Sequence, residues 1–319
     1  MNVIPKTASR AAIAKPFPAH AILAAMSLVI LGKDRALRLV LAAVLARGHV
    51  LLNDLPGVGK TTLSLGLARL LGLDFARVQM TVDLLPGDIL GTSVYNPKEQ
   101  HFVFHPGPIF HEFLLIDEIN RASPRTQSAL LEAMAEGQVT VDGHGHPLPA
   151  AFLVIATQNP QEHAGVFPLP ESQLDRFMIS ISLGYPDMAA ERRLLNDEQD
   201  VPEHLHPVIH PDELLSWYAT VDDLFVSSEI REMLLQLAQA SRHDPELACG
   251  LSPRGLLALL RMTRAWAALS GRDFVAPDDL QAVTVAVIGH RLQVANGSDG
   301  ALYAAQLMQR EWGLAPLDA

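Results

Sequence analysis

The residues best suited to chemistry form a glycine-rich segment that follows an apolar run and precedes a helical pattern. Its glycines would let backbone N–H groups turn inward around phosphate oxygens, and the new helix would add unsatisfied donors and its positive end. Lys60 would reach the β- and γ-phosphates of ATP, and the Thr61 hydroxyl would bind Mg²⁺. The predicted nucleotide-binding residues are Pro56, Gly57, Val58, Gly59, Lys60, Thr61 and Thr62.

One position departs from the strict phosphate-loop pattern. That pattern has glycine where this sequence has Asp54. Aspartate is tolerated there if φ stays negative or the residue adopts the left-handed region. The alternative interpretation, a glycine-rich turn with a surface lysine, fits the strand–loop–helix context poorly.

A second candidate element is an apolar strand that ends in two carboxylates, Asp117 and Glu118. Its distance along the chain from Lys60 suits a neighbouring parallel strand. Asp117 would hold the magnesium shell, and Glu118 would polarise the attacking water. An exposed acidic loop end is common for either motif alone, but the two motifs together favour ATP hydrolysis.

The elements that must position these residues alternate between short β-rich runs and helical patterns from about Val50 to Leu183. This alternation is typical of a parallel sheet with crossover helices, and consecutive apolar positions indicate strands covered on both faces. After residue 186 helices dominate, with start signals at Ser252-Pro253 and Ala276-Pro277. The strand candidates are His49–Asn53, Phe75–Met80, Phe113–Asp117, Phe152–Thr157 and Phe177–Leu183.

Two further segments could form hairpins. Between Asp83 and Ile109 the chain is punctuated by glycine and proline, which predicts either a hairpin inserted into a helix or a long loop. A second hairpin is expected around Asp142-Gly143, because Asp-Gly is a preferred two-residue turn.

Further motifs make the sequence resemble the MoxR family of AAA+ ATPases, from about Leu31 to the C-terminus. The resemblance implies a P-loop NTPase (AAA+) fold of class α/β, with a three-layer αβα domain around a parallel sheet and an all-α lid. It also implies a helix-2 insert near residues 85–108 and a pre-sensor-1 hairpin near 138–149. We accordingly divide the chain into a flexible N-terminal arm (1–18), a nucleotide-binding domain (19–186) and a helical lid (187–319). The motifs are Asp117–Ala122, Gln127–Met134, Ala156–Pro160 and Phe167–Phe177.

The resemblance also assigns three residues to catalysis. Asn159 matches sensor 1, which orients water and the γ-phosphate. Arg176 matches the arginine finger that acts on the neighbouring subunit's nucleotide, and Arg254 matches sensor 2, which couples the lid to the nucleotide of its own subunit. As alternatives, Asn159 could be a turn residue and Arg176 a surface ion-pair partner, and Arg121 or Arg125 could reach the subunit interface instead.

Composition narrows the class of protein. The chain has 319 residues, enough for two packed domains, and its net charge of −11 disfavours nucleic acid as the main partner. The single cysteine, Cys249, cannot form an internal disulfide, which fits a cytoplasmic location.

The apolar run Ala21–Leu31 is too short to insert in a membrane, and we expect two helices of a globular core rather than a signal peptide. The histidine groups His204, His206 and His210, and His144 and His146, lack the spacing of a helical metal pair.

The leading hypothesis is an oligomeric ATPase that hydrolyses ATP with Mg²⁺ and remodels, matures or activates a client protein. The resemblance implies a homo-oligomer, usually a ring of six subunits, and a partner with a von Willebrand factor A domain. The two predicted hairpins are the candidates for client contact. Alternatives are a nucleotide-gated binding module with little hydrolysis and an AAA+ motor that works on DNA.

Overall fold

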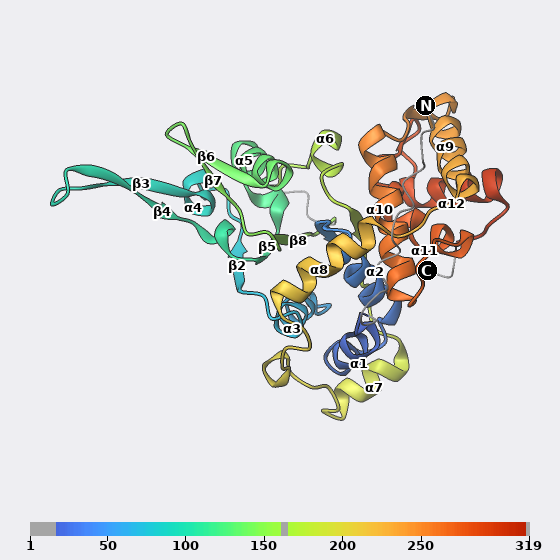
Figure 1. Ribbon diagram of the computed structural model, residues 1–319, viewed down its shortest axis with the longest axis horizontal. Coiled ribbons are helices and arrows are strands. Elements are labelled where there is room, and N and C mark those ends of the chain that lie inside the picture. Colours follow the sequence, from blue (N-terminus) through green and yellow to red (C-terminus); the bar gives the residue numbers. More distant parts are fainter. Residues whose placement is uncertain (1–16, 161–164, 317–319) are drawn as a thin grey trace, which may run out of the picture.

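The computed structural model describes residues 17–160 and 165–316. Its centre is a five-stranded parallel sheet in the order β2-β5-β8-β1-β9 (Figure 1). All five strand predictions are confirmed, with small differences at the strand ends. The strands are β1 (Val50–Asn53), β2 (Phe75–Gln79), β5 (Phe113–Asp117), β8 (Leu153–Gln158) and β9 (Ile179–Ile181).

Both faces of this sheet are buried, which explains the consecutive apolar positions. In β5, Phe113 and Leu115 belong to one apolar core, whereas Leu114 and Ile116 belong to another. Side chains of a strand alternate between faces, so the two cores lie on opposite sides of the sheet. The first core includes α1 (Ala19–Val29), α2 (Asp34–Leu45) and α3 (Lys60–Leu70), and the second includes α5 (Pro124–Glu136). The predicted three-layer αβα domain is therefore present.

Two hairpins leave this domain on the side away from the lid (Figure 1). The first follows the short helix α4 (Pro86–Leu90) and pairs β3 (Gly91–Asn96) with β4 (His101–Pro106), so the segment is a hairpin and not a long loop. The second pairs β6 (Gln138–Val141) with β7 (His144–Pro147). Its turn residues Asp142 and Gly143 have φ values of 50° and 77°, as a primed turn requires.

The C-terminal part of the chain forms a helical bundle. Its helices are α9 (Ser228–His243), α10 (Pro253–Leu269), α11 (Pro277–Ile288) and α12 (Gly300–Trp312). Ser252 caps α10 by accepting a hydrogen bond from the Gly255 N–H at 2.9 Å, in agreement with the start signal in the sequence. The bundle also contains a short antiparallel pair of strands that the sequence did not indicate, β10 (Leu247–Cys249) and β11 (Gln293–Val294).

The segment between the sheet and this bundle packs along the first helical layer. It contains α7 (Met188–Leu195), the 3₁₀ turn η3 (Pro202–His204) and α8 (Pro211–Asp222). Backbone hydrogen bonds join Asp200 to Leu28 at 2.9 Å and Val208 to Leu70 at 2.8 Å. Residues 187–222 are therefore helices packed on the nucleotide-binding domain and not an extended linker to the bundle. The domain division at residue 186 stays a prediction.

The predicted arm, residues 1–18, lies outside the described residues except for Phe17 and Pro18. Phe17 is buried, and its ring lies 5.4 Å from that of Trp217 in α8. Within residues 17–160 and 165–316, no helix has the length and apolar character needed to cross a membrane.

Candidate active site

The glycine-rich loop connects β1 to α3 at the carboxyl end of the sheet. Gly57 and Gly59 have φ values of 85° and 90°, which side chains other than that of glycine rarely adopt. A Cβ atom on Gly59 would also lie 3.1 Å from Ile30 Cδ1. The loop therefore needs glycine at both positions, and its N–H groups and the start of α3 suit a phosphate anion.

Lys60 lies across this loop. Its ammonium donates to the carbonyl oxygens of Asp54 at 2.8 Å and Leu55 at 3.1 Å. Burial lowers the pKa of Lys60, whereas the charges of Asp54, Asp117 and Glu118 raise it. Because β1 and β5 run parallel on either side of β8, the lysine lies at the same edge of the sheet as the two carboxylates predicted for the metal and the water.

Asp54, the departure from the strict pattern, has a defined structural role. It does not adopt a positive φ, and its side chain is buried. Its carboxylate accepts hydrogen bonds from Ser182 Oγ at 2.6 Å and from the N–H groups of Leu183 at 2.6 Å and Gly184 at 2.9 Å. The aspartate ties the start of the phosphate loop to the segment that leaves β9.

Asp117 and Glu118 lie at the carboxyl end of β5, between β2 and β8. Arg77 Nε donates to Asp117 Oδ2 at 2.7 Å, and Thr157 Oγ1 donates to Asp117 Oδ1 at 3.3 Å. Glu118 has a left-handed φ of 57°, an uncommon conformation for a residue that is not glycine. Its carboxylate accepts a hydrogen bond from Gln79 Nε2 at 2.7 Å and lies 3.1 Å from Arg121 Nε.

The donor set at this end of the sheet fits Mg²⁺. Magnesium prefers hard oxygen ligands, usually one or two carboxylates together with waters and substrate phosphates. The Thr61 hydroxyl at the start of α3 and the Asp117 carboxylate at the end of β5 are of this kind, and both follow strands at the carboxyl edge of the parallel sheet. Among the described residues, no cluster of three or more histidine, cysteine, aspartate or glutamate side chains could hold a metal by itself.

Asn159 follows β8 directly, beside the phosphate loop. The preceding residue, Gln158, pairs with Asn53 and accepts a hydrogen bond from the Asp54 N–H at 3.1 Å. Asn159 lines a pocket there together with Asn120 and Gln158. The structure therefore brings this sequence-predicted residue to the same end of the sheet as Lys60 and Glu118.

Arg176 lies at the other end of the sheet. It precedes β9, and the N–H of Met178 donates to the carbonyl of His49 just before β1 at 2.7 Å. The Arg176 guanidinium is half-buried and donates to the Leu131 carbonyl of α5. Its Nε is buried without a hydrogen-bond partner. Arg176 thus does not reach the phosphate loop of its own chain.

Arg254, the predicted sensor 2 residue, also lies at the amino end of the sheet. It is exposed in the first turn of α10, whose cap Ser252 donates to Asp175 at 3.2 Å. Its charge contributes, after burial and the Met134 hydrogen bond, to the pKa of His49, which precedes β1. Lys60 follows the opposite end of β1, roughly 10 Å away at ~3.3 Å per strand residue. In this structure α10 packs at the amino end of the sheet, so Arg254 lies away from the phosphate loop of its own chain, and its assignment as sensor 2 stays a prediction.

The other arginines considered for the interface differ from each other. Arg121 Nε lies 3.1 Å from the Glu118 carboxylate of its own chain, and its role at an interface stays a prediction. Arg125 is exposed in the first turn of α5. The sequence interpretation missed Arg77 and Gln79, although these polar residues alternate along a strand candidate that ends beside the carboxylates.

The fold and this site together define an AAA+ ATPase. A family model for the ATPase family associated with various cellular activities (AAA) matches residues 49–179, and one for the AAA lid domain matches residues 239–309. The chain belongs to the MoxR family of AAA+ ATPases.

Several relatives support this assignment. Chaperone MoxR1 of Mycobacterium tuberculosis is 39% identical over 83% of this chain and 72% of its own length. Protein MoxR of Methylorubrum extorquens is 33% identical over 82% of this chain and 84% of its own length. The uncharacterized protein YeaC of Bacillus subtilis is 47% identical over 83% of this chain and 84% of its own. A crystal structure of a candidate ATPase from Cytophaga hutchinsonii superposes with a TM-score of 0.81 at 33% identity, covering 91% of this chain and 93% of that chain.

Proposed function

We propose that this protein hydrolyses ATP to ADP and phosphate with Mg²⁺. The observation that carries the proposal is that Lys60, Asp117 and Glu118 follow or end the parallel strands β1 and β5, which flank β8, at the same edge of the sheet. The loop N–H groups and Lys60 would bind the phosphates, while Thr61 and Asp117 would hold Mg²⁺. Glu118 would accept a proton from the attacking water, and Asn159 would orient that water.

The active assembly is a homo-oligomer in which each site is completed by its neighbour. Arg176 and Arg254 lie at the amino end of the sheet, away from the phosphate loop of their own chain. An arginine that cannot reach its own nucleotide can still stabilise the transition-state charge on an adjacent subunit. This geometry supports a ring, for which the family implies six subunits, with Arg176 as the finger and Arg254 acting beside it.

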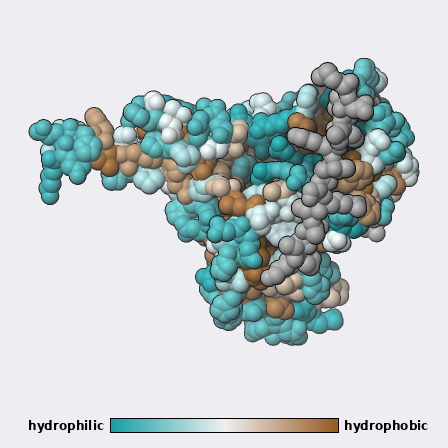
Figure 2. All heavy atoms as spheres, viewed as in Figure 1, coloured by the Kyte–Doolittle hydropathy of each residue, from teal (hydrophilic) through white to brown (hydrophobic). Residues whose placement is uncertain are grey.

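The ATP cycle remodels a client protein, in keeping with the chaperone name of the Mycobacterium relative. The β3–β4 hairpin is the candidate contact. Figure 2 shows apolar residues along its length behind a hydrophilic tip, and Val94, Tyr95 and Phe102 are each about half exposed or more. Phe104 stacks on His146 of the second hairpin with ring centroids 3.9 Å apart, so the two hairpins contact each other. We also propose that the protein acts with a partner that carries a von Willebrand factor A domain, and that it is located in the cytoplasm.

A test of the assembly is the ATPase rate per subunit as a function of protein concentration. We expect specific activity to rise with concentration, and Arg176→Ala to lose on the order of 10³-fold in rate while still binding ATP. Activity that is independent of concentration, with Arg176→Ala at the native rate, would contradict completion between subunits.

A test of client contact is Val94→Ser combined with Phe102→Ser, with Leu302→Ser on exposed α12 as the matched control. We expect the double variant to keep basal hydrolysis and to lose stimulation by client candidates from neighbouring genes. Equal stimulation of both variants would contradict the hairpin assignment.

A second candidate, a nucleotide-gated module with little turnover, is favoured by one contact. Gln79 donates to the same Glu118 oxygen that lies near Arg121, so the proposed base is held by two neighbours. ATP binding without phosphate release at any concentration, and no release on addition of a partner, would favour this candidate.

A further inference from the structure

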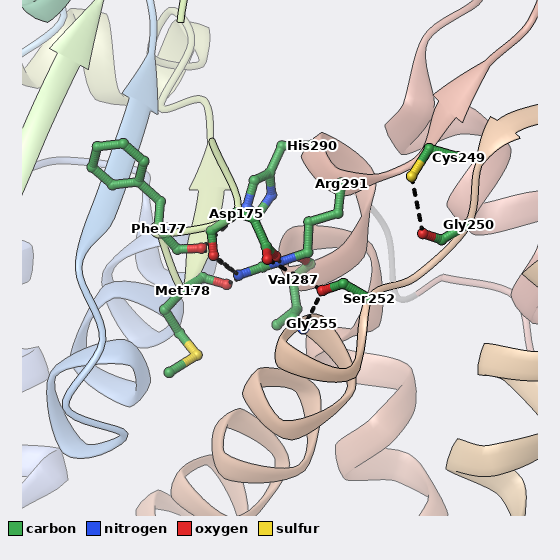
Figure 3. Close-up of polar contacts among 10 residues, drawn as sticks. All are labelled: Asp175, Phe177, Met178, Cys249, Gly250, Ser252, Gly255, Val287, His290 and Arg291. Carbon is green, nitrogen blue, oxygen red and sulfur yellow. Dashed lines mark hydrogen bonds and ion pairs between the residues drawn. The ribbon is translucent and has the colours of Figure 1, made fainter. Parts of the chain in front are cut away.

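A buried ion pair joins the lid to the turn that precedes β9. Arg291 ends the 3₁₀ turn η4 (Gly289–Arg291), which follows α11. Its side chain is only 3% exposed, yet Arg291 Nε lies 2.7 Å from Asp175 Oδ1 (Figure 3). Asp175 directly precedes Arg176. The lid thus places a buried charge against the residue adjacent to the proposed finger.

The same guanidinium binds backbone on both sides of Arg176. Its Nη2 donates to the carbonyls of Asp175 at 3.2 Å and Phe177 at 2.5 Å, and its Nη1 donates to that of Met178 at 3.1 Å. Nη1 also donates to the carbonyl of Val287 near the end of α11. A planar group with five donors can make these contacts at once, whereas a lysine ammonium cannot reproduce their fork geometry.

The second oxygen of Asp175 engages the cap of the helix that carries Arg254. Ser252 Oγ donates to Asp175 Oδ2 at 3.2 Å and accepts from the Gly255 N–H at 2.9 Å (Figure 3). A Cβ atom on Gly255 would lie 2.9 Å from Arg291 Cδ, so glycine leaves the space through which the arginine reaches Asp175. One carboxylate therefore connects the finger turn, the Arg254 helix and Arg291.

A buried ion pair could also serve only to hold the fold together. The lid contains a second buried ion pair with which Arg291–Asp175 can be compared. Arg272 pairs with the fully buried Asp279 at the amino end of α11, within the lid. Arg291 lies at the other end of the same helix and, besides the Val287 carbonyl, contacts Asp175, Phe177 and Met178 outside the lid. Buried ion pairs often add little net stability, because desolvation offsets their attraction. The position of these contacts around Arg176 thus distinguishes Arg291 from Arg272.

We infer that Arg291, through Asp175, positions the Arg176 turn and the Arg254 helix as one unit, so that the lid sets where both arginines meet the neighbouring nucleotide. Arg291 is a positioning residue, because it acts through Asp175 and the backbone around Arg176. The inference rests on the proposed hydrolysis between subunits. Loss of Arg291 should therefore lower the rate of ATP turnover and leave nucleotide binding by its own chain unchanged.

The first test compares Arg291→Lys and Arg291→Met with Arg272→Gln as the matched lid control. A misplacement of about 1 Å can cost on the order of 10²-fold in rate, so we expect a kcat loss of that order in both Arg291 variants. The Kd for ATP should stay within about twofold of the native value, because Lys60 and the loop are untouched. Arg272→Gln should keep the native kcat where its unfolding midpoint shows a folded lid. Retention of the native kcat by Arg291→Lys, or an equal kcat loss in Arg272→Gln, would overturn the inference.

The second test mixes two inactive variants, Arg291→Met and Glu118→Gln, in one assembly. The Arg291→Met subunit keeps its own catalytic residues and would receive correctly placed arginines from a Glu118→Gln neighbour. We expect the mixture to hydrolyse ATP well above the sum of the separate variants. A mixed assembly with no gain would mean that Arg291 serves its own site, against the inference.

These tests separate the inference from the function on which it rests. A native protein without turnover at any concentration contradicts the proposed hydrolysis, and the inference fails with it. If the native protein hydrolyses ATP and Arg291→Met hydrolyses it at the same rate, the role of Arg291 is contradicted but the proposed hydrolysis is not.

Discussion

Gln79 Nε2 donates a hydrogen bond to Glu118 Oε2 at 2.7 Å, so the end of β2 holds the side chain proposed to activate water. Glu118 also has a left-handed backbone, which fixes the direction of its side chain. Its position therefore depends on a neighbouring strand as well as on its own.

The first prediction concerns this contact. Replacing Gln79 with Leu removes one of the two neighbours of Glu118 Oε2 and leaves Arg121 Nε at 3.1 Å, so the carboxylate is less restrained and freer to accept a proton from water. We expect basal phosphate release to rise severalfold, toward the ~10²-fold scale of a general base. The measurement is steady-state phosphate release at saturating ATP, with Gln138→Leu in exposed β6 as the control. A lower rate in Gln79→Leu would show that Gln79 orients the base productively.

The second prediction concerns Asp54. In Asp54→Asn the new amide N–H₂ would face one of the three donors that now converge on the carboxylate. We expect a loss of roughly 2–3 kcal/mol in the free energy of unfolding, together with weaker ATP binding because the loop loses its anchor. Denaturant unfolding and nucleotide titration measure the two effects, and exposed Asp83→Asn is the control. The role given to Asp54 is wrong if the two variants unfold at the same midpoint.

The third prediction concerns pH. Burial is the main cause that lowers the pKa of His290 to about 3, and the neighbouring Arg291 charge lowers it further. Burial is also the main cause that lowers the pKa of His49 to about 4. Histidine in the unfolded chain titrates near 6.5, so between these values the unfolded state binds more protons than the folded state. Stability is therefore lost as pH falls below about 6.5, by up to about 1.4 kcal/mol per pH unit for each histidine.

Unfolding midpoints between pH 7.5 and 5 measure this slope. His290→Gln should be less stable at neutral pH but should show a shallower slope, whereas exposed His206→Gln should keep the native one. Identical slopes in all three proteins would mean that His290 titrates in the folded state as it does in the unfolded chain.

Features that depend on local pattern were predictable from the sequence. Strand β5 begins and ends where the apolar run Phe113–Asp117 does, because a strand covered on both faces needs apolar residues at every position. The turn at Asp142-Gly143 was predictable because its chemistry lies within two residues. The clustering of Lys60, Asp117 and Glu118 follows from a parallel sheet, since the carboxyl ends of the strands meet at one edge.

Features that depend on distant contacts were not predictable. The partners of Asp54 lie 128 to 130 residues along the chain, and Arg291 lies 116 residues from Asp175. The placement of Arg254 follows a segment, residues 187–222, that is held to α1 and α3 by backbone hydrogen bonds between residues far apart in the sequence. A single sequence shows the residue types in these contacts but not which of them meet.

The most direct test of the central claim measures ATP binding and phosphate release in parallel for the native protein and Glu118→Gln, with Mg²⁺ and at high protein concentration. The account predicts that both proteins bind ATP with similar affinity and that only the native protein releases phosphate at an appreciable rate. Equal release by the two proteins would show that Glu118 is not the base, and binding without release by the native protein and its partners would contradict ATP hydrolysis at this site.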